Sequence, residues 1–199
     1  MDFGILLLII SLYLNKKIYN CYCMNFLHRS FSFLSPLKSM VTESPLVGKT
    51  LSSEALSETL TTHKNEKTTL KKLLGELPPD YKGLVLFLFP SAGTPGCTKQ
   101  ACNFTSNHKA FKDKGYEVYG LTSSERTPAG KWTEKHKLSF TTLVDKELKL
   151  VDHLDCRKLG LFVHRSHLVL SKDGKVLAFE KGVNAEKSAS RVLELLETL

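Results

Sequence analysis

The sequence lacks several features that assign proteins to familiar classes. It has no apolar run near the length of about 20 residues that a membrane-spanning helix needs, since the apolar run at residues 3–14 holds only twelve. It has no internal repeat and no low-complexity segment, which excludes repeat architectures. Basic residues outnumber acidic ones by 28 to 20, a net charge of +8, but they form no cluster interleaved with aromatic residues. We therefore assign the excess to a solvated surface and do not expect nucleic acid as a partner.

Cysteine is scarce and its arrangement excludes several kinds of site. The chain has five cysteines, an odd number that is a poor basis for a disulfide scaffold. Four residues separate Cys97 from Cys102, whereas a C-x-x-C dithiol exchanger has two. Two cysteines do not complete a tetrahedral zinc shell, so no metal is expected. In a reducing compartment a close pair of cysteines is more typical of catalysis. The remaining cysteines are Cys21, Cys23 and Cys156.

Residues 1–40 have the composition of a targeting leader. The twelve-residue apolar run suits a signal-peptide core, although Asp2 stands where a basic residue is usual. Residues 15–40 hold four basic residues, four serines and no acidic residue, as in a transit peptide. This combination resembles the bipartite leaders of secondary plastids and predicts delivery to an organelle of plastid type. The alternatives are a mitochondrial leader, a short membrane anchor, or translation from Met24 or Met40 with a nuclear or cytosolic protein.

Residues 41–199 have the pattern of one domain in which strands and helices alternate. Residues 84–89 form a continuous apolar run, as expected of a strand buried on both faces. An Asp-Gly pair at residues 173–174 predicts a hairpin. Further strands are expected at 117–121, 141–144, 167–170 and 176–179, and helices at 69–77, 95–112, 128–136 and 186–199. This order predicts an α/β domain with a central mixed sheet flanked by helices.

The run PSAGTPGC at residues 90–97 brings a cysteine into the first turn of a helix. Thr94 suits the N-cap, and Pro95 suits the first helical position, where its missing N–H costs nothing. Cys97 then lies among backbone N–H groups that lack an intrahelical acceptor, at the positive end of the helix dipole. Both features favour a thiolate over a thiol, so Cys97 is a candidate nucleophile.

One face of this helix carries Cys97 at its N-terminal end. The positions Cys97, Ala101, Phe104, His108 and Phe111 advance by four and three residues, and the aromatic residues mark them as the core face. Cys97 is therefore expected in the floor of a pocket, and a small buried cysteine that only packs is the alternative. His108 is expected to be a packed histidine rather than a metal ligand.

Cys102 lies five residues beyond Cys97. On an ideal helix their Cα atoms are roughly 8.6 Å apart, and a disulfide needs less than about 7 Å. The two cysteines cannot be bridged while the helix is intact, so pairing requires its first turns to unwind. The alternative is that Cys102 is an inert packing residue.

The pattern P-x-x-x-T-x-x-C at residues 90–97 resembles the active-site motif of the peroxiredoxins. The longer run TPGCTKQAC at residues 94–102 resembles that of the peroxiredoxin Q group, also called bacterioferritin comigratory protein. The resemblance extends over about residues 84–179 and is absent from residues 1–40. The motif is long and fixed in its spacing, so it is specific.

This resemblance implies a thioredoxin-like fold and peroxide reduction without metal, haem or flavin. Cys97 would be the peroxidatic cysteine and Cys102 the resolving cysteine. Arg165, just before a predicted strand, matches the arginine of the family that pairs with the thiolate and orients the peroxide; the alternative is a plain surface arginine. Thr94 would hydrogen-bond the peroxide, and Pro90 would shield the sulfur from water.

The chain departs from the group in two places. Gln100 stands where the group usually has glutamate, so this position keeps its hydrogen bonding but loses a charge. Cys156 has no counterpart in the pattern. Free packing is the favoured interpretation of Cys156, and an alternative resolving role stays open.

These expectations define a thiol-dependent peroxidase for hydrogen peroxide and organic hydroperoxides, acting in antioxidant defence. The reaction would pass through a sulfenic acid on Cys97, and a thioredoxin-type dithiol would reduce the resulting disulfide. A monomer is expected. The alternative function is a peroxide-sensing redox switch that binds a partner or nucleic acid. A purely structural thioredoxin-like module is disfavoured by the intact motif.

Overall fold

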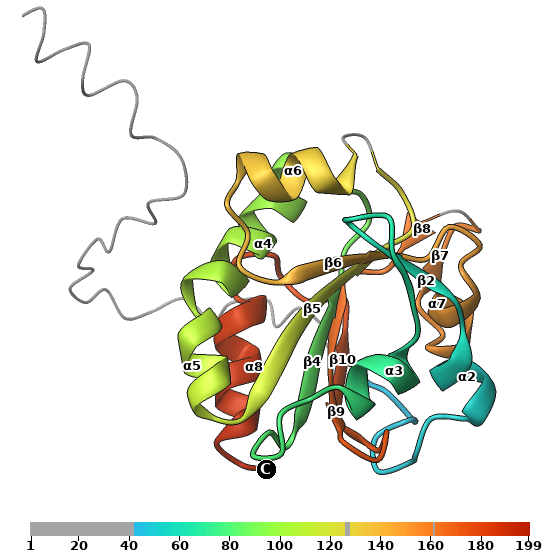
Figure 1. Ribbon diagram of the computed structural model, residues 1–199, viewed down its shortest axis with the longest axis vertical. Coiled ribbons are helices and arrows are strands. Elements are labelled where there is room, and N and C mark those ends of the chain that lie inside the picture. Colours follow the sequence, from blue (N-terminus) through green and yellow to red (C-terminus); the bar gives the residue numbers. More distant parts are fainter. Residues whose placement is uncertain (1–41, 126–127, 161) are drawn as a thin grey trace, which may run out of the picture. The chain divides into compact units, whose positions relative to one another are not determined.

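The computed structural model describes residues 42–125, 128–160 and 162–199 (Figure 1). The leader predicted for residues 1–40, with Cys21 and Cys23, lies outside the described residues. The strands are β1 (Thr42–Glu43), β2 (Leu60–Thr62), β3 (Lys67–Thr68), β4 (Gly83–Leu88), β5 (Tyr116–Thr122), β6 (Thr141–Val144), β7 (Arg157–Lys158), β8 (Phe162–Val163), β9 (Ser166–Ser171) and β10 (Val176–Lys181). The helices are α2 (Ser53–Ser57), α3 (Leu70–Gly75), α4 (Pro95–Ser106), α5 (His108–Asp113), α6 (Ala129–Lys135), α7 (Lys149–His153) and α8 (Ser188–Leu196).

The central sheet is mixed, as predicted. Its strand order is β1-β10-β9-β4-β5-β6-β2-β3, and β7 pairs with β8 in a separate ribbon. β4 runs parallel to β5 and antiparallel to β9, and β5 runs parallel to β6. All six residues of β4 are buried, which explains its continuous apolar sequence. β9 and β10 form the antiparallel hairpin that the Asp-Gly pair predicts.

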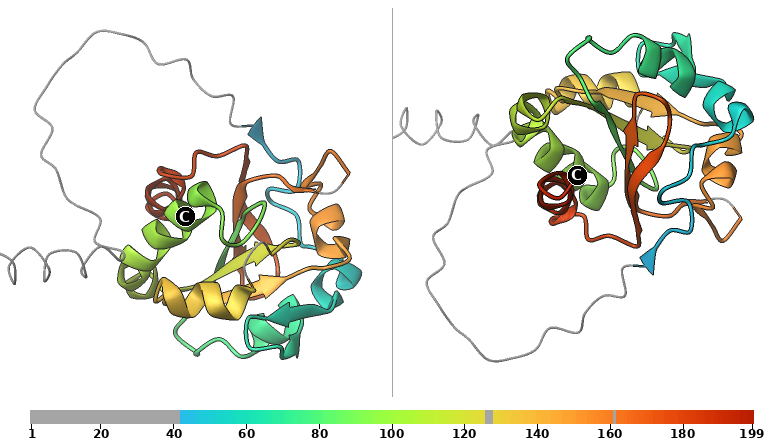
Figure 2. Two further views of the ribbon diagram at one scale, coloured as in Figure 1. Left: turned by 90° about the horizontal axis from the view of Figure 1, so that it is seen from above. Right: turned by 90° about the horizontal axis from the view of Figure 1, so that it is seen from below.

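Helices cover both faces of the sheet, and each face has its own core (Figures 1 and 2). Successive residues of β4 alternate between the two cores, because side chains of a strand point to opposite faces in turn. Phe87 packs with residues of α4, α5, α6 and α8, and this core includes Cys97. Leu86 packs with residues of α2, α3 and α7, and this core includes Cys156. Cys97 and Cys156 therefore lie on opposite faces of the sheet.

The helix predicted for residues 95–112 is divided in two. α4 ends at Ser106 and α5 begins at His108, with Asn107 between them. Both the backbone N–H and the side-chain Nδ2 of Asn107 donate to the carbonyl of Asn103, at 3.2 and 2.8 Å. A side chain that competes for backbone acceptors in this way favours a helix end. The core face nevertheless continues, because Phe104 and Phe111 stack with their ring centroids 5.6 Å apart.

Several short elements had no sequence signal. β1, β2, β3 and α2 lie in a largely polar stretch, and lengths of two to five residues are too short to show a period. α7 depends on Asp145, whose two carboxylate oxygens accept the backbone N–H groups of Lys149 and Val151 at 3.1 and 2.9 Å. Such a contact joins residues that the hydrophobic pattern does not connect.

Candidate active site

Cys97 lies at the edge of the sheet where β4 ends. The chain leaves β4 after Leu88 and turns with Gly93 at a positive φ of 86°, which glycine adopts at little cost. α4 then begins at Pro95 and places Cys97 in its first turn. The cysteine is only 1% exposed and is a free thiol. The predicted position, in a buried floor at a helix N-terminus, is the one observed.

Thr94 occupies the predicted N-cap position, but its hydroxyl has another role. Its backbone is extended, with φ −84° and ψ 149°, and its carbonyl accepts the backbone N–H of Thr98 at 2.9 Å. The hydroxyl Oγ1 donates to the carbonyl of Ser91 at 3.2 Å instead of capping the helix. Since the donor of this hydroxyl is engaged, its lone pairs are what it can offer to a substrate. Pro90, half-buried, begins the same loop.

Arg165 is distant from Cys97 in the sequence but contacts its sulfur in the folded protein. β9 is antiparallel to β4, with Ser166 opposite Leu88. Arg165, one residue before β9, is thereby brought to the edge at which α4 begins. Its Nη2 donates to Cys97 Sγ at 3.4 Å. The side chain is half-buried and makes this contact, which a plain surface arginine would not.

A second nitrogen of Arg165 begins a buried chain of polar contacts. Nη1 donates to Gln100 Oε1, and Gln100 Nε2 donates to Ser188 Oγ at 3.1 Å. Ser188 Oγ contacts His167 Nδ1 at 3.0 Å. His167 Nε2 contacts Glu180 Oε2 at 3.1 Å. No pattern in the sequence pointed to Ser188, His167 or Glu180, and the one signal of this network was the glutamine at position 100.

This series of hydrogen bonds ends at Glu180, whose carboxylate is strongly stabilised in its ionised form. The hydrogen bond from His167, followed by those from Arg191, lowers the pKa of Glu180 from 4.5 to about 2, although burial acts in the opposite sense. Arg191 on α8 approaches Glu180 Oε1 with Nη2 at 2.8 Å. The polar chain therefore runs from the cysteine to an ion pair near the surface.

The first turns of α4 are also held to the neighbouring helices. Trp132 of α6, 1% exposed, donates from Nε1 to Thr98 Oγ1 at 3.1 Å. Lys99 forms an ion pair with Glu186, and Asn103 Nδ2 donates to the carbonyl of Glu186 at 2.8 Å. These contacts would have to break if α4 unwound.

Cys102 is half-buried in the middle of α4. α4 is continuous from Pro95 to Ser106, so the helical separation of the two cysteines is preserved. Cys97 is a free thiol and is not joined to Cys102. A resolving role for Cys102 thus keeps its requirement that α4 opens.

Cys156 belongs to the other face. It is fully buried among aliphatic residues, and its Sγ contacts Ser166 Oγ at 3.5 Å. Burial is the main reason that the pKa of the Cys156 thiol is raised. Because the sheet stands between Cys156 and Cys97, an alternative resolving role for Cys156 has no support in the structure.

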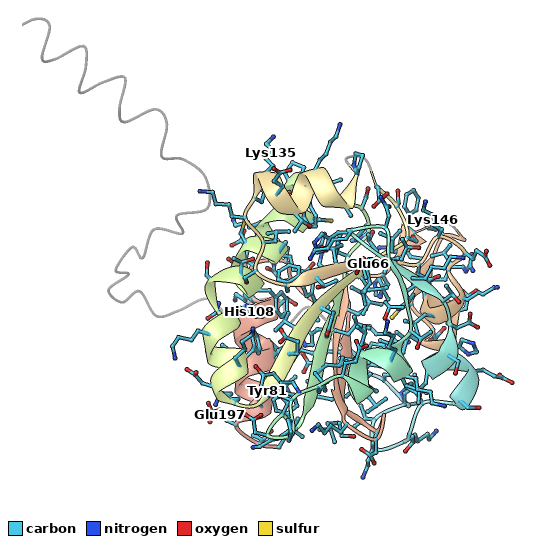
Figure 3. The ribbon with its side chains drawn as sticks, in the orientation of Figure 1. Glu66, Tyr81, His108, Lys135, Lys146 and Glu197 are labelled. Carbon is cyan, nitrogen blue, oxygen red and sulfur yellow. The ribbon has the colours of Figure 1, made fainter. Side chains whose placement is uncertain are left out.

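The described residues offer no site for a metal ion. His108 lies at the start of α5 (Figure 3). Its Nε2 contacts Glu117 of β5 at 3.0 Å, so the ring is held against the sheet. Within the described ranges, no group of three or more histidine, cysteine, aspartate or glutamate side chains could hold a metal.

In residues 42–125, 128–160 and 162–199, no helix combines the length and the apolar character needed to cross a membrane.

Known proteins resemble this chain over most of its described length. A family model described as AhpC/TSA matches residues 51–179. Peroxiredoxin Bcp of Bacillus subtilis (strain 168) is 32% identical over 129 residues, which cover 60% of this chain and 82% of the relative. Chloroplastic peroxiredoxin Q of Sedum lineare is 31% identical over 179 residues, which cover 88% of this chain and 92% of the relative.

The fold has a counterpart among solved structures. The crystal structure of peroxidoxin BcpB from Mycobacterium tuberculosis superimposes with a TM-score of 0.66 and 25% identity, covering 77% of this chain and 97% of that one. The thioredoxin-like fold expected from the resemblance is therefore confirmed. On the match to its family model and to these relatives, the chain belongs to the AhpC/TSA family, among the thiol-dependent peroxidases called peroxiredoxin Q or Bcp.

Proposed function

We propose that Cys97 is the peroxidatic cysteine and that Arg165 holds it ready to react. The observation that carries this proposal is the 3.4 Å contact from Arg165 Nη2 to Cys97 Sγ at the first turn of α4. A guanidinium and the helix N-terminus both stabilise a negative sulfur. The same groups stabilise the charge that moves onto the leaving oxygen of the peroxide.

In the first step the Cys97 thiolate attacks one oxygen of the peroxide. An S–O bond forms and the O–O bond breaks, so the sulfur is oxidised to a sulfenic acid and the peroxide is reduced. The leaving oxygen takes a proton and departs as water or an alcohol. Thr94 Oγ1, whose hydrogen is held by Ser91, would accept a hydrogen bond from the peroxide O–H. Pro90 at the start of the loop would limit the access of water to the sulfur.

In the second step Cys102 attacks the sulfenic sulfur and water leaves. This step needs the first turns of α4 to unwind, which breaks the contacts of Thr98 with Trp132 and of Gln100 with Ser188. Each such hydrogen bond contributes about 1 kcal/mol, so local opening is accessible well below the stability of a domain. A thioredoxin-type dithiol then exchanges with the disulfide and restores both thiols.

Membership of the family supports proposals for the class of substrate, the type of reductant and the compartment. A peroxide substrate and a thioredoxin-type reductant fit the peroxiredoxins. Hydrogen peroxide and small organic hydroperoxides are the proposed substrates, with the monomer as the proposed working form. Because relatives such as that of Sedum lineare are chloroplastic, we propose that residues 1–40 direct the chain to an organelle of plastid type.

The test is peroxide consumption coupled to thioredoxin, with Cys97→Ser compared with Cys156→Ser. Cys97→Ser should abolish turnover, and Cys156→Ser, which removes a buried thiol on the other face, should keep it. Mass spectrometry of the wild type after one equivalent of peroxide should show a link between residues 97 and 102. Turnover by Cys97→Ser would refute the assignment of the nucleophile. A stable sulfenic acid without the link would refute Cys102 as the resolving cysteine.

A further inference from the structure

Three side chains that connect Arg165 to Glu180 are almost completely shielded from solvent. Gln100 and His167 are 0% exposed and Ser188 is 1% exposed. They come from α4, β9 and the first residue of α8, so three separate elements meet at one chain of hydrogen bonds. Buried polar groups without partners are costly, and each of these three side chains contacts a partner on either side.

The two ends of this chain determine the direction of the hydrogen bonds beside them. Arginine can only donate, so the oxygen of Gln100 must face Arg165 and its NH₂ must face Ser188. Ser188 Oγ accepts from that NH₂. At the other end the ionised Glu180 carboxylate can only accept, so His167 Nε2 donates to it. The direction of the bond between Ser188 Oγ and His167 Nδ1 depends on the tautomer of His167, and a hydroxyl that donates to Nδ1 corresponds to the Nε2–H tautomer.

We propose that Ser188, His167 and Glu180 act as positioning residues for the reaction at Cys97, forming with Gln100 a buried relay of one polarity that fixes His167 as the neutral Nε2–H tautomer and holds the Arg165 guanidinium against the sulfur. The proposal rests on the proposed role of Cys97 and Arg165. None of the three residues touches the reacting atoms, and each acts through Gln100.

The physical basis is the orientation of a planar group. Arg165 presents Nη1 to Gln100 and Nη2 to Cys97, so fixing one edge of the guanidinium fixes the other. Gln100 is itself held because its second polar atom is bonded to Ser188. Without this restraint the guanidinium gains rotational freedom and the sulfur loses part of its electrostatic partner. Residues that hold the substrate-contacting groups in place preserve the geometry that a reaction needs.

The surroundings of His167 are consistent with a neutral ring. The opposite residue on β4 is the apolar Phe87. The ring contacts the carboxylate of Glu180 on β10, which is also bound by Arg191 of α8, and Arg165 lies three contacts away through Ser188 and Gln100. One carboxylate therefore balances Arg191, and the relay needs no second positive charge on His167.

A glutamine at position 100 is required by this polarity. A carboxylate there would accept from Arg165 and would also demand a proton from the Ser188 hydroxyl. Ser188 could then only accept from His167 Nδ1, which would need a proton on both ring nitrogens. Gln100→Glu should therefore reverse the hydrogen bond between Ser188 and His167 and place a proton on both ring nitrogens of His167.

The first experiment measures the tautomer of His167 by ¹⁵N NMR in the full chain, with the signal assigned by its loss in His167→Asn. We expect an unprotonated Nδ1 and a protonated Nε2 in the wild type, and protons on both nitrogens in Gln100→Glu. A proton on Nδ1 in the wild type would overturn the proposal, and so would an unchanged ring in Gln100→Glu. This measurement needs no turnover, so it can fail while the role of Cys97 stands.

The second experiment compares Ser188→Ala with Ser190→Ala, an exposed serine on the same helix that contacts only the helix backbone. Ser188→Ala should lower kcat/KM for peroxide about tenfold, the value of one lost hydrogen bond, and should lower the ionised fraction of Cys97 measured by thiolate absorbance at neutral pH. The KM for the dithiol reductant should not change, and Ser190→Ala should match the wild type throughout. A folded Ser188→Ala with wild-type thiolate absorbance and wild-type kcat/KM would show that Ser188 serves packing alone.

Discussion

Cys97 and Cys156 are both free thiols and both almost completely buried. They contact two consecutive residues of the chain, yet their surroundings differ in kind. Arg165 points to one face of the sheet and contacts Cys97, while Ser166 points to the other face and contacts Cys156. Cys97 has a guanidinium and a helix N-terminus. Cys156 contacts the Ser166 hydroxyl in a largely aliphatic core, and burial raises the pKa of its thiol more than Ser166 and Lys181 lower it. Burial alone does not make a thiol inert or reactive; the charge and donors that accompany it do.

The alternation of a strand produces this separation. Leu168 and Leu170 follow Ser166 into one core, and Val169 follows His167 into the other. A shift of one residue in the pairing of β9 with β4 would exchange the two faces. The arginine would then approach Cys156 and the serine would approach Cys97. The register Leu88 to Ser166 is therefore as important for the site as the motif around Cys97.

The largest expected effect comes from removing the positive charge of Arg165 beside Cys97. Arg165→Met should lower kcat/KM for peroxide on the order of 100-fold, as with loss of a donor aimed at developing charge. Arg157→Met, at an exposed arginine paired with Asp152, is the matched control and should keep activity. Stopped-flow peroxide consumption measures both variants. Activity within twofold of the wild type in Arg165→Met would mean that the contact with Cys97 has no catalytic role.

The two thiols should differ widely in alkylation. At neutral pH in the native protein, an alkylating reagent should modify Cys97 at least about tenfold faster than Cys156, because burial raises the pKa of the Cys156 thiol. Peptide mass spectrometry resolves the two sites. Denaturation should remove most of the difference. Equal rates in the native state would contradict the contrast between the two faces.

The ion pair at the end of the relay should make stability depend on acid. Because the pKa of Glu180 is lowered from 4.5 to about 2, its contribution to stability is full above pH 4.5 and is lost as the pH falls toward about 2. Glu180→Gln should therefore unfold more easily than the wild type at neutral pH, with a difference that shrinks below pH 4.5. Denaturant titrations across pH 2–7 measure this. Glu194→Gln, at an exposed partner of the same arginine, should show a much smaller change, and an equal one would exclude a special role for Glu180.

The smallest expected effect on activity is at the face of the sheet that carries Cys156. Ser166→Ala removes the partner of Cys156 and a hydrogen bond from Ser166 Oγ to the carbonyl of His164 at 2.9 Å. The free energy of unfolding should fall by about 1 kcal/mol, and kcat/KM for peroxide should stay within twofold. Thermal unfolding and the peroxidase assay together measure it. A large loss of activity would show that the two faces are coupled through β9.

The local part of the site was readable from the sequence. A strand buried on both faces, a proline-glycine loop and a cysteine in the first turn of a helix are all set by neighbouring residues, and β4, α4 and Cys97 lie where they were predicted. The sequence did not show the break at Asn107, because that break depends on one side chain competing for one carbonyl. It also predicted an N-cap at Thr94 without showing that the hydroxyl would turn to Ser91.

By itself the sequence determined the strand, loop and helix N-terminus that hold Cys97, the proposed nucleophile, because helix ends, strands and turns arise from contacts between residues a few positions apart. Only the tertiary structure decided which cation meets the sulfur, since Arg165 lies 68 positions from Cys97. It also decided that Gln100 faces Ser188, 88 positions away. Such contacts depend on the pairing and register of β4 and β9 and on the docking of α8, and no local pattern of residues encodes them.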